Sequence, residues 1–140
     1  MKVSISMLPN ISINLFIVLI AGIISVAVAG VWFSPILFGK QWKKLSGVKK
    51  NNISGWQKYL MGLLGALILC YVLAYFIKLG GLVSWSEGVK AGLILWLGFI
   101  VPVSLERVLW EGKSVKLYVI NIGYWLVSVC IAGAVLAVWA

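Results

Sequence analysis

The sequence predicts an all-α integral membrane protein with four transmembrane helices and a short amphipathic interfacial segment after the first. Of its 140 residues, 63% are hydrophobic and 11% are charged, whereas ordinary globular domains carry about 25% charged residues. Charge-free runs approach or exceed the roughly twenty apolar residues that a helix needs to cross a bilayer. The runs show no alternation of period two, so we expect helices rather than the strands of a closed barrel.

The charge-free runs divide a single membrane domain, residues 1–140, into four predicted spans. They lie at about residues 11–33, 57–78, 86–108 and 115–139, and a basic loop at 39–56 joins the first two. The third run is the shortest and reaches full length only with Gly88, Val89 and the aliphatic stem of Lys90. The first run is too long for the apolar core of a signal peptide and lacks a cleavage site, so we interpret it as a retained helix.

The first span is predicted to end in a structured turn. Ser34 precedes Pro35, an order typical of a helix N-cap followed by the first helical residue. A residue before proline also disfavours the helical region, so the first span is expected to stop near Phe33. The residues assigned to this turn are Trp32, Ser34, Pro35, Phe38 and Gly39.

The segment after the turn has the spacing of an interfacial helix. Phe38, Trp42 and Leu45 recur at i, i+4 and i+7, which predicts a short helix with its apolar side in the membrane and its lysines toward lipid phosphates. The residues predicted to contact headgroups are Lys40, Trp42, Lys43, Lys44, Lys49 and Lys50. The alternative is a disordered basic loop anchored by one tryptophan, and the glycines at 39 and 47 favour that alternative.

Capping signals precede the other three spans. The pairs Ser54–Gln57 and Ser84–Glu87 have the spacing of a capping box, in which each side chain satisfies a free backbone N–H at the start of a helix. Ser114 can cap the fourth helix with its hydroxyl alone, by accepting a hydrogen bond from a backbone N–H of the first turn. These local signals predict where the second, third and fourth helices begin.

The positive charges predict the orientation in the membrane. Nine basic residues lie in the two loops on one side: Lys40, Lys43, Lys44, Lys49, Lys50, Lys58, Arg107, Lys113 and Lys116. Three lie on the other side: Lys2, Lys78 and Lys90. The positive-inside rule places the larger group in the cytoplasm, so both termini are expected outside the cell (inner) membrane.

Composition also limits the partners. The net charge is +9, but the lysines flank spans, which indicates anionic lipid headgroups rather than nucleic acid. The two cysteines lie in apolar runs and the chain has no histidine, so we expect no metal and no other cofactor. Small residues at spacing four mark every span and favour close helix packing. Because several such stripes are present, a homo-oligomer is expected, most simply a two-fold dimer.

A polar pocket is predicted in the cytoplasmic half of the bundle. Its residues are Trp96, Gly98, Pro102, Glu106, Asn121 and Trp125. Pro102 leaves the Gly98 carbonyl without its usual helical donor, and polar groups such as Glu106 are costly at membrane depth. The alternatives are an interfacial ion pair for Glu106, a kink relieved by neighbours for Pro102, and a hydrogen bond to another helix for Asn121.

The composition makes an enzymatic function unexpected, because the chain has no histidine, no aspartate and a single plausible general base, Glu106. The first expectation is a non-enzymatic scaffold or lipid-interacting membrane subunit, since the basic segment explains most of the charge without a pore. The alternative is a small oligomeric transporter or channel for a small solute or ion. A cavity that reaches Asn121 would favour the alternative, and a dry bundle would favour the scaffold.

One stretch also carries a family resemblance. The sequence Trp32-Phe33-Ser34-Pro35 is followed by Phe38-Gly39 and then Trp42, and an aromatic third span with Glu106 comes later. With these motifs the chain resembles the small bacterial integral-membrane proteins grouped as domain of unknown function 1761. The resemblance implies the four-span layout, and it implies no substrate because the family has no established activity.

Overall fold

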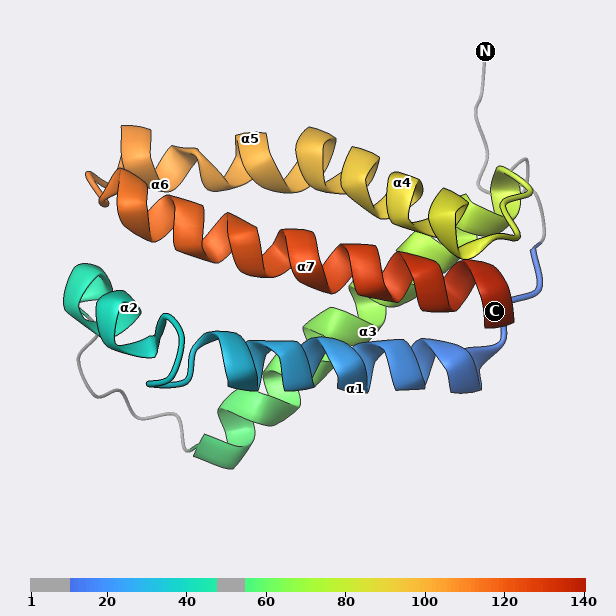
Figure 1. The fold of residues 1–140 in the computed structure, drawn as a ribbon, viewed down its shortest axis with the longest axis horizontal. Helices are drawn as coiled ribbons and strands as arrows, with labels where there is room; N and C mark the ends of the chain where they lie inside the picture. The colour runs from blue at the N-terminus through green and yellow to red at the C-terminus, as the bar shows by residue number, and fades with distance from the viewer. Residues whose placement is uncertain (1–10, 48–54) are drawn as a thin grey trace, which may run out of the picture.

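Four candidate membrane spans make up most of the described residues, and Figure 1 shows their arrangement. The computed structural model describes residues 11–47 and 55–140. The helices long and apolar enough to cross a membrane are α1 (Leu15–Trp32), α3 (Gly55–Leu79), a third span (Trp85–Leu109) and α7 (Val115–Trp139). No strand occurs in the described ranges. The predicted all-α class with four candidate spans is therefore confirmed.

The third span is a chain of four shorter helices. They are α4 (Trp85–Leu95), the π-helix η2 (Trp96–Ile100), α5 (Val101–Ser104) and α6 (Glu106–Leu109). The π-helix ends just before Pro102, and the N–H of Val101 donates to the Trp96 carbonyl five residues back. A proline cannot donate within a helix, and a single π turn is a common way to absorb such a break.

Side-chain caps set the helix starts. Asn14 accepts from the N–H of Phe16 at 3.1 Å, so α1 begins at Leu15 rather than at residue 11 as predicted. The capping box of Ser84 and Glu87 is present at the start of α4, and Ser114 caps α7; both were predicted. The other predicted box involves Ser54, which lies outside the described residues.

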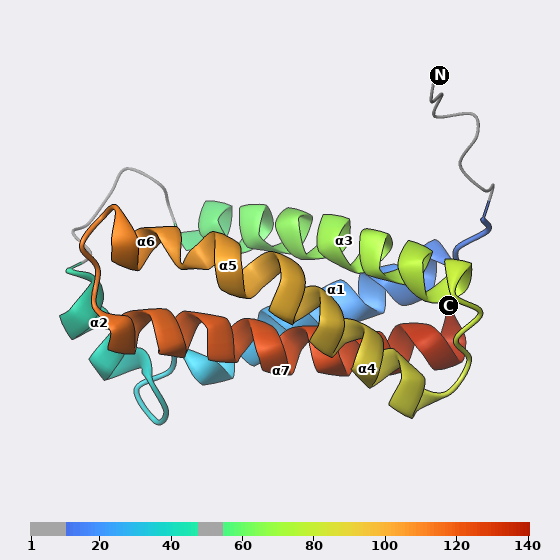
Figure 2. The ribbon, with the colours of Figure 1, turned by 90° about the horizontal axis from the view of Figure 1, so that it is seen from above.

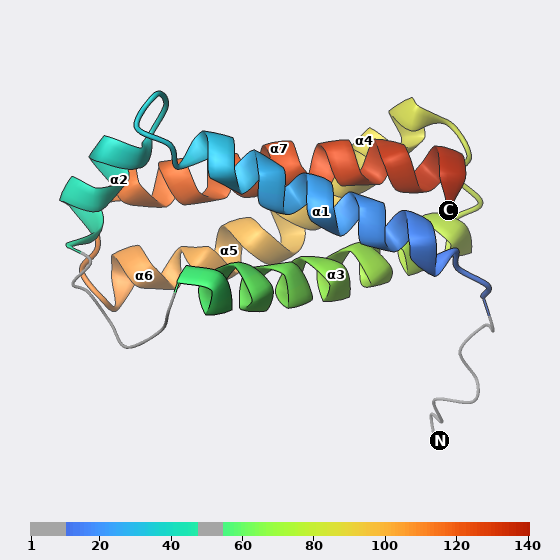
Figure 3. The ribbon, with the colours of Figure 1, turned by 90° about the horizontal axis from the view of Figure 1, so that it is seen from below.

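The spans run up and down, so α1 begins and α7 ends at one end of the bundle. At the opposite end lie the interfacial helix α2 (Gly39–Ser46) and α6 (Figure 1). Figures 2 and 3 show the third span and α1 on opposite faces of the bundle. Helix α7 packs against α1, α3 and α4, which makes it the central element of the bundle. We call the end that holds α2 and α6 the basic end.

Small residues bring the helices close together. A side chain at Gly88 would collide with the backbone of Gly133, and one at Gly92 would collide with the backbone of Val129. The small residues of α1 and α3 are buried as well: Ala21, Ser25, Ala66, Cys70 and Ala74. The predicted stripes thus hold this chain's own helices together by close backbone approach, and these buried residues are not on a free surface.

Candidate functional site

The site begins with the turn that follows α1. Trp32, the last residue of α1, donates a hydrogen bond from its indole nitrogen to the Ile120 carbonyl of α7 at 3.0 Å. Its ring stacks on Phe38 with 4.7 Å between centroids. A Cβ on Gly123 would come within 3.0 Å of the same indole. Trp32 therefore attaches the turn to α7, and its indole ring packs on Gly123.

Ser34 does not start a helix, which corrects the predicted N-cap. Its carbonyl accepts from Leu37 N at 3.1 Å and from Gly39 N at 2.9 Å. Its hydroxyl donates back to the Val31 carbonyl at 2.7 Å. Pro35 thus occupies the second position of a tight turn, where its fixed φ is favourable. The next helix, α2, begins at Gly39 rather than at Pro35.

Gly39 is needed because the chain folds back on itself here. The residue is buried, and a Cβ at this position would overlap the backbone of Phe33 and lie 2.7 Å from the Ser34 carbonyl oxygen. Any side chain would push α2 away from the end of α1. The glycine that weakened the prediction of a helix is the residue that allows this helix to dock.

Helix α2 is amphipathic as predicted, and the alternative of a disordered loop is wrong for the described part of the segment. Trp42 lies against Phe33, with 5.6 Å between ring centroids, and Phe33 lies 5.5 Å from Tyr124 of α7. Lys40, Lys43 and Lys44 are exposed. The apolar face of α2 was predicted to point into the membrane. The structure corrects this prediction for Trp42, which packs against the protein through Phe33. Lys49 and Lys50 lie outside the described residues.

A second contact ties α2 to the loop before α7. The Lys113 ammonium donates to the Ser46 carbonyl at the last residue of α2, at 3.4 Å. This is a long hydrogen bond at an exposed site, so its contribution is small. Together with the aromatic contacts it places α2 across the basic end of the bundle.

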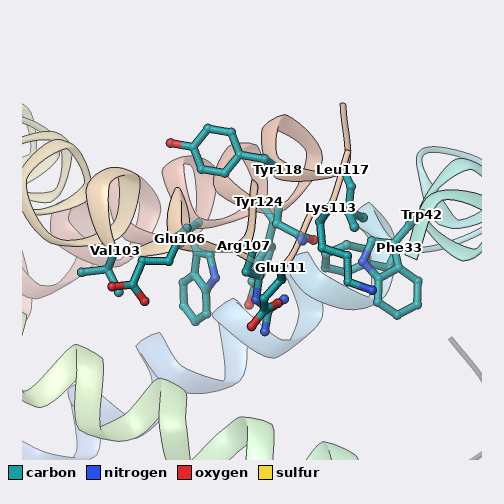
Figure 4. A pocket seen from close by; sticks show the side chains of 13 residues that line it. Phe33, Trp42, Val103, Glu106, Arg107, Glu111, Lys113, Leu117, Tyr118 and Tyr124 are labelled. Atoms are coloured by element: carbon teal, nitrogen blue, oxygen red, sulfur yellow. The ribbon is translucent and has the colours of Figure 1, made fainter. Parts of the chain in front are cut away.

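A partly open cavity of about 520 Å³ lies behind α2, and we call it the end pocket. The end of α1, α2, α5, α6, the loop after α6 and α7 form its wall (Figure 4). It is lined by Phe33, Trp42, Val103, Ser104, Glu106, Arg107, Glu111, Lys113, Leu117, Tyr118, Asn121, Tyr124 and Trp125. Aromatic and apolar groups therefore share this pocket with four charged side chains.

The family of the chain can now be stated. The model of a family described as a protein of unknown function (DUF1761) matches residues 16–137. The chain belongs to the DUF1761 family. Comparison with curated proteins and with solved structures gave no match. The matched range contains the docked turn, α2 and every residue that lines the end pocket.

The end pocket of this DUF1761 member contains half of the residues predicted for a polar pocket. Glu106, Asn121 and Trp125 line it together, although they come from α6 and from the middle of α7. Asn121 makes no side-chain hydrogen bond to any other residue in the described part of the chain. Its amide is thus left for the pocket, in contrast to the expected bond with another helix.

The other predicted residues lie elsewhere. The Trp96 indole donates to the Ile122 carbonyl at 2.7 Å, so it serves as a second anchor on α7. Gly98 and Pro102 are exposed and do not line the pocket. The π-helix lies in this part of the third span, and the Gly98 carbonyl does not line the end pocket.

Several pocket residues in this DUF1761 member were missed by sequence reasoning. Tyr118 donates its hydroxyl to the Val101 carbonyl at 2.8 Å, and Tyr124 donates to the Ser25 carbonyl at 3.1 Å. Tyr118, Asn121 and Trp125 recur at i, i+3 and i+7, which puts them on one face of α7. That spacing was the available signal, and it was hidden because the span is apolar on every side.

The charged residues of the end pocket come from one short stretch. Glu106, Arg107, Glu111 and Lys113 are all exposed, and within the described residues none of them forms an ion pair with another. In the view of Figure 4 the Glu106 carboxylate lies on one side and Trp42 on the other, with Arg107 and Glu111 between them. The two negative and two positive groups are therefore available to a ligand.

The half of the bundle away from the end pocket is packed around small and aliphatic side chains. Its core contains Val18, Ala21, Cys70, Leu73, Ala74, Ile77, Ala132, Leu136 and Ala137. No group of three or more metal-binding side chains occurs in the described ranges. The end pocket thus lies at the basic end, and this hydrophobic core lies between it and the opposite end of the bundle.

Proposed function

We propose that this DUF1761 protein is a non-enzymatic, lipid-interacting subunit of the cell (inner) membrane. The observation that carries the proposal is the placement of α2. One face of this helix is docked on the bundle through Trp42 and Phe33, while Lys40, Lys43 and Lys44 are exposed. A rigid interfacial helix with free lysines suits anionic headgroups, and each lysine near such a surface contributes about 1 kcal/mol.

The same proposal gives the protein an orientation. Seven basic residues of the described ranges belong to the basic end: Lys40, Lys43, Lys44, Lys58, Arg107, Lys113 and Lys116. Two belong to the opposite end: Lys78 and Lys90. The positive-inside rule favours a cytoplasmic basic end and termini outside. No nucleic acid is needed to account for this charge.

A homo-oligomer, most simply a dimer, is part of the proposal. Gly62 and Gly65 of α3 are exposed and have open space where a side chain would be. They are therefore small residues that the chain does not use for its own packing, and α3 can approach a second copy there. Native mass spectrometry of the protein released from membranes reports the subunit number, and a monomer under all conditions would refute this part.

The lipid interaction is tested by counting retained lipids. The protein is placed in nanodiscs that contain phosphatidylglycerol and phosphatidylcholine, and retained lipids are counted by native mass spectrometry. A K40Q/K43Q/K44Q variant should retain on the order of a hundredfold less phosphatidylglycerol, because roughly 1 kcal/mol is lost for each of the three lysines. The control K78Q/K90Q removes charge at the opposite end and should match the wild type. Equal retention by the triple variant and the wild type would refute the proposal.

A small oligomeric transporter is the second candidate, and the end pocket favours it. The pocket reaches Asn121 and Trp125, well inside α7. Because the opposite half of the bundle is packed, a path across the membrane would need a second copy or a change of conformation. Proteoliposome swelling with small neutral and charged solutes tests this function. Solute entry that the N121A variant abolishes would support transport, and no entry for any solute would count against it.

A further inference from the structure

The geometry points to the end pocket as a binding site for a zwitterionic headgroup that carries an ammonium and a phosphate. This site is distinct from the lysine face of α2, where the proposed function places anionic lipid. The charges in the pocket balance, with Glu106 and Glu111 against Arg107 and Lys113. A ligand of one sign would meet repulsion from two of the four groups, whereas a zwitterion can match both signs.

The four charged groups do not satisfy one another. Within the described residues they form no ion pair, and the Lys113 ammonium makes only the long contact to the Ser46 carbonyl. Arg107 offers planar paired donors that suit a phosphate, and Lys113 adds a second positive charge at the same mouth. The carboxylates of Glu106 and Glu111 are then left for an ammonium group.

Aromatic rings support the ammonium side of the inference. The pocket is lined by Phe33, Trp42, Tyr118, Tyr124 and Trp125. An ammonium over the face of a tryptophan or tyrosine is attracted by the electron-rich ring, and more strongly when it is shielded from water. Phe33 and Trp42 are fixed against each other at 5.6 Å, so this part of the wall is ordered before a ligand arrives.

The depth of the pocket suits an amphiphile rather than a free ion. Charged groups come from the loop side, while Val103 and Leu117 line the pocket from the spans. The Asn121 amide lies one turn beyond Leu117 along α7, deeper in the span, and makes no side-chain hydrogen bond within the described residues. It can donate to a phosphate or ester oxygen of a lipid whose chains extend into the membrane. The chemical class is thus a phospholipid with a phosphoethanolamine headgroup, or the same headgroup in soluble form.

The experiment uses the full chain in detergent, with native mass spectrometry of bound lipid. Phosphatidylethanolamine, phosphatidylglycerol and a single-chain quaternary ammonium amphiphile are titrated separately. We expect retention of phosphatidylethanolamine to exceed that of the other two when the α2 lysines are replaced (K40Q/K43Q/K44Q). The pocket variants R107Q and E106Q/E111Q should each lower that retention by roughly threefold to tenfold, because the contacts are exposed. K116Q, a neighbouring lysine that does not line the pocket, is the matched control.

Competition with soluble phosphoethanolamine identifies the source of the headgroup. Displacement of the lipid at millimolar concentration supports a site that reads the headgroup alone, and lack of displacement supports a site that also needs the lipid chains. Equal retention of all three amphiphiles, or a preference for the quaternary ammonium amphiphile, would overturn the inference. So would losses in R107Q no larger than those in K116Q. A negative result in this experiment does not affect the phosphatidylglycerol test on the α2 lysines, so the two proposals can be refuted independently.

Discussion

The Trp32 indole nitrogen lies 3.0 Å from the Ile120 carbonyl oxygen, and the Trp96 indole nitrogen lies 2.7 Å from the carbonyl of Ile122. Two tryptophans from the first and third spans therefore bond to α7 only two residues apart. A hydrogen-bonded carbonyl in a helix keeps a second lone pair for such a donor. These two bonds fix α1 and the third span to α7 at positions that flank Asn121.

The first prediction concerns the Trp32 bond. Trp32→Phe keeps an aromatic ring beside Phe38 but removes the N–H donor, so the free energy of unfolding should fall by about 1 kcal/mol. Unfolding in mixed micelles, followed by circular dichroism, measures this change. Trp110→Phe is the control because Trp110 is 84% exposed. An equal loss of unfolding free energy in the two variants would show that the indole hydrogen bond of Trp32 does not stabilise the fold.

The second prediction concerns the close approach at Gly39. Gly39→Ala places a Cβ against the backbone of Phe33 and Ser34, so α2 should leave the bundle at a cost of about 1–3 kcal/mol. Trypsin should then cut faster at Lys43 and Lys44. Gly55→Ala is the matched control, because nothing lies within 4 Å of a Cβ there. Unchanged cleavage in Gly39→Ala would contradict the docked position of α2.

The third prediction compares two glycines of the same span. Gly92→Ala would force α4 away from Val129 of α7, whereas Gly98 has open space around it. We expect Gly92→Ala to lower the free energy of unfolding by about 2 kcal/mol or more and Gly98→Ala to change it by less than about 0.5 kcal/mol. Denaturation in mixed micelles tests both. A larger loss in Gly98→Ala would mean that the π-helix packs against something else.

The fourth prediction concerns a buried hydroxyl. Ser128 lies beside Tyr124 but has no hydrogen bond of good geometry in the described part of the chain. Because an unsatisfied buried hydroxyl is costly, Ser128→Ala should leave stability unchanged or raise it by up to about 1 kcal/mol. Ser25→Ala is the comparison, since the Ser25 hydroxyl donates to the Ala21 carbonyl at 3.1 Å. Destabilisation by Ser128→Ala would reveal a partner for this hydroxyl.

The fifth prediction tests the orientation. In a variant with Cys70 and Cys130 replaced by alanine, a cysteine is introduced at Lys43 or at Val83, which are both exposed and lie at opposite ends. A membrane-impermeant maleimide added to intact cells should label the cysteine at 83 and leave the one at 43 unlabelled. Permeabilised cells should show labelling at both. The reverse pattern in intact cells would invert the proposed topology.

Part of the pocket was predictable from the sequence and part was not. Glu106 and Asn121 were identified because polar groups are rare in apolar spans. Gly98, Pro102 and Trp96 were also placed in the pocket, the first two because the proline removes a helical donor, and the structure puts all three elsewhere. A π-helix lies at Trp96–Ile100, and its wider turn rotates the following part of the third span about the helix axis. The spacing of residues in the sequence does not report that rotation.

The four spans, the interfacial helix and the caps at Ser84 and Ser114 could be predicted from the amino-acid sequence. These follow from run length, from charge position and from local hydrogen bonds, which depend on residues near one another in the chain. Three relationships came from the folded chain alone: Gly39 lies against the end of α1, Trp32 and Trp96 bond to α7, and Glu106 shares a pocket with Asn121. Those contacts depend on how each helix is rotated about its axis, and a span that is apolar on every side carries little information about its rotation.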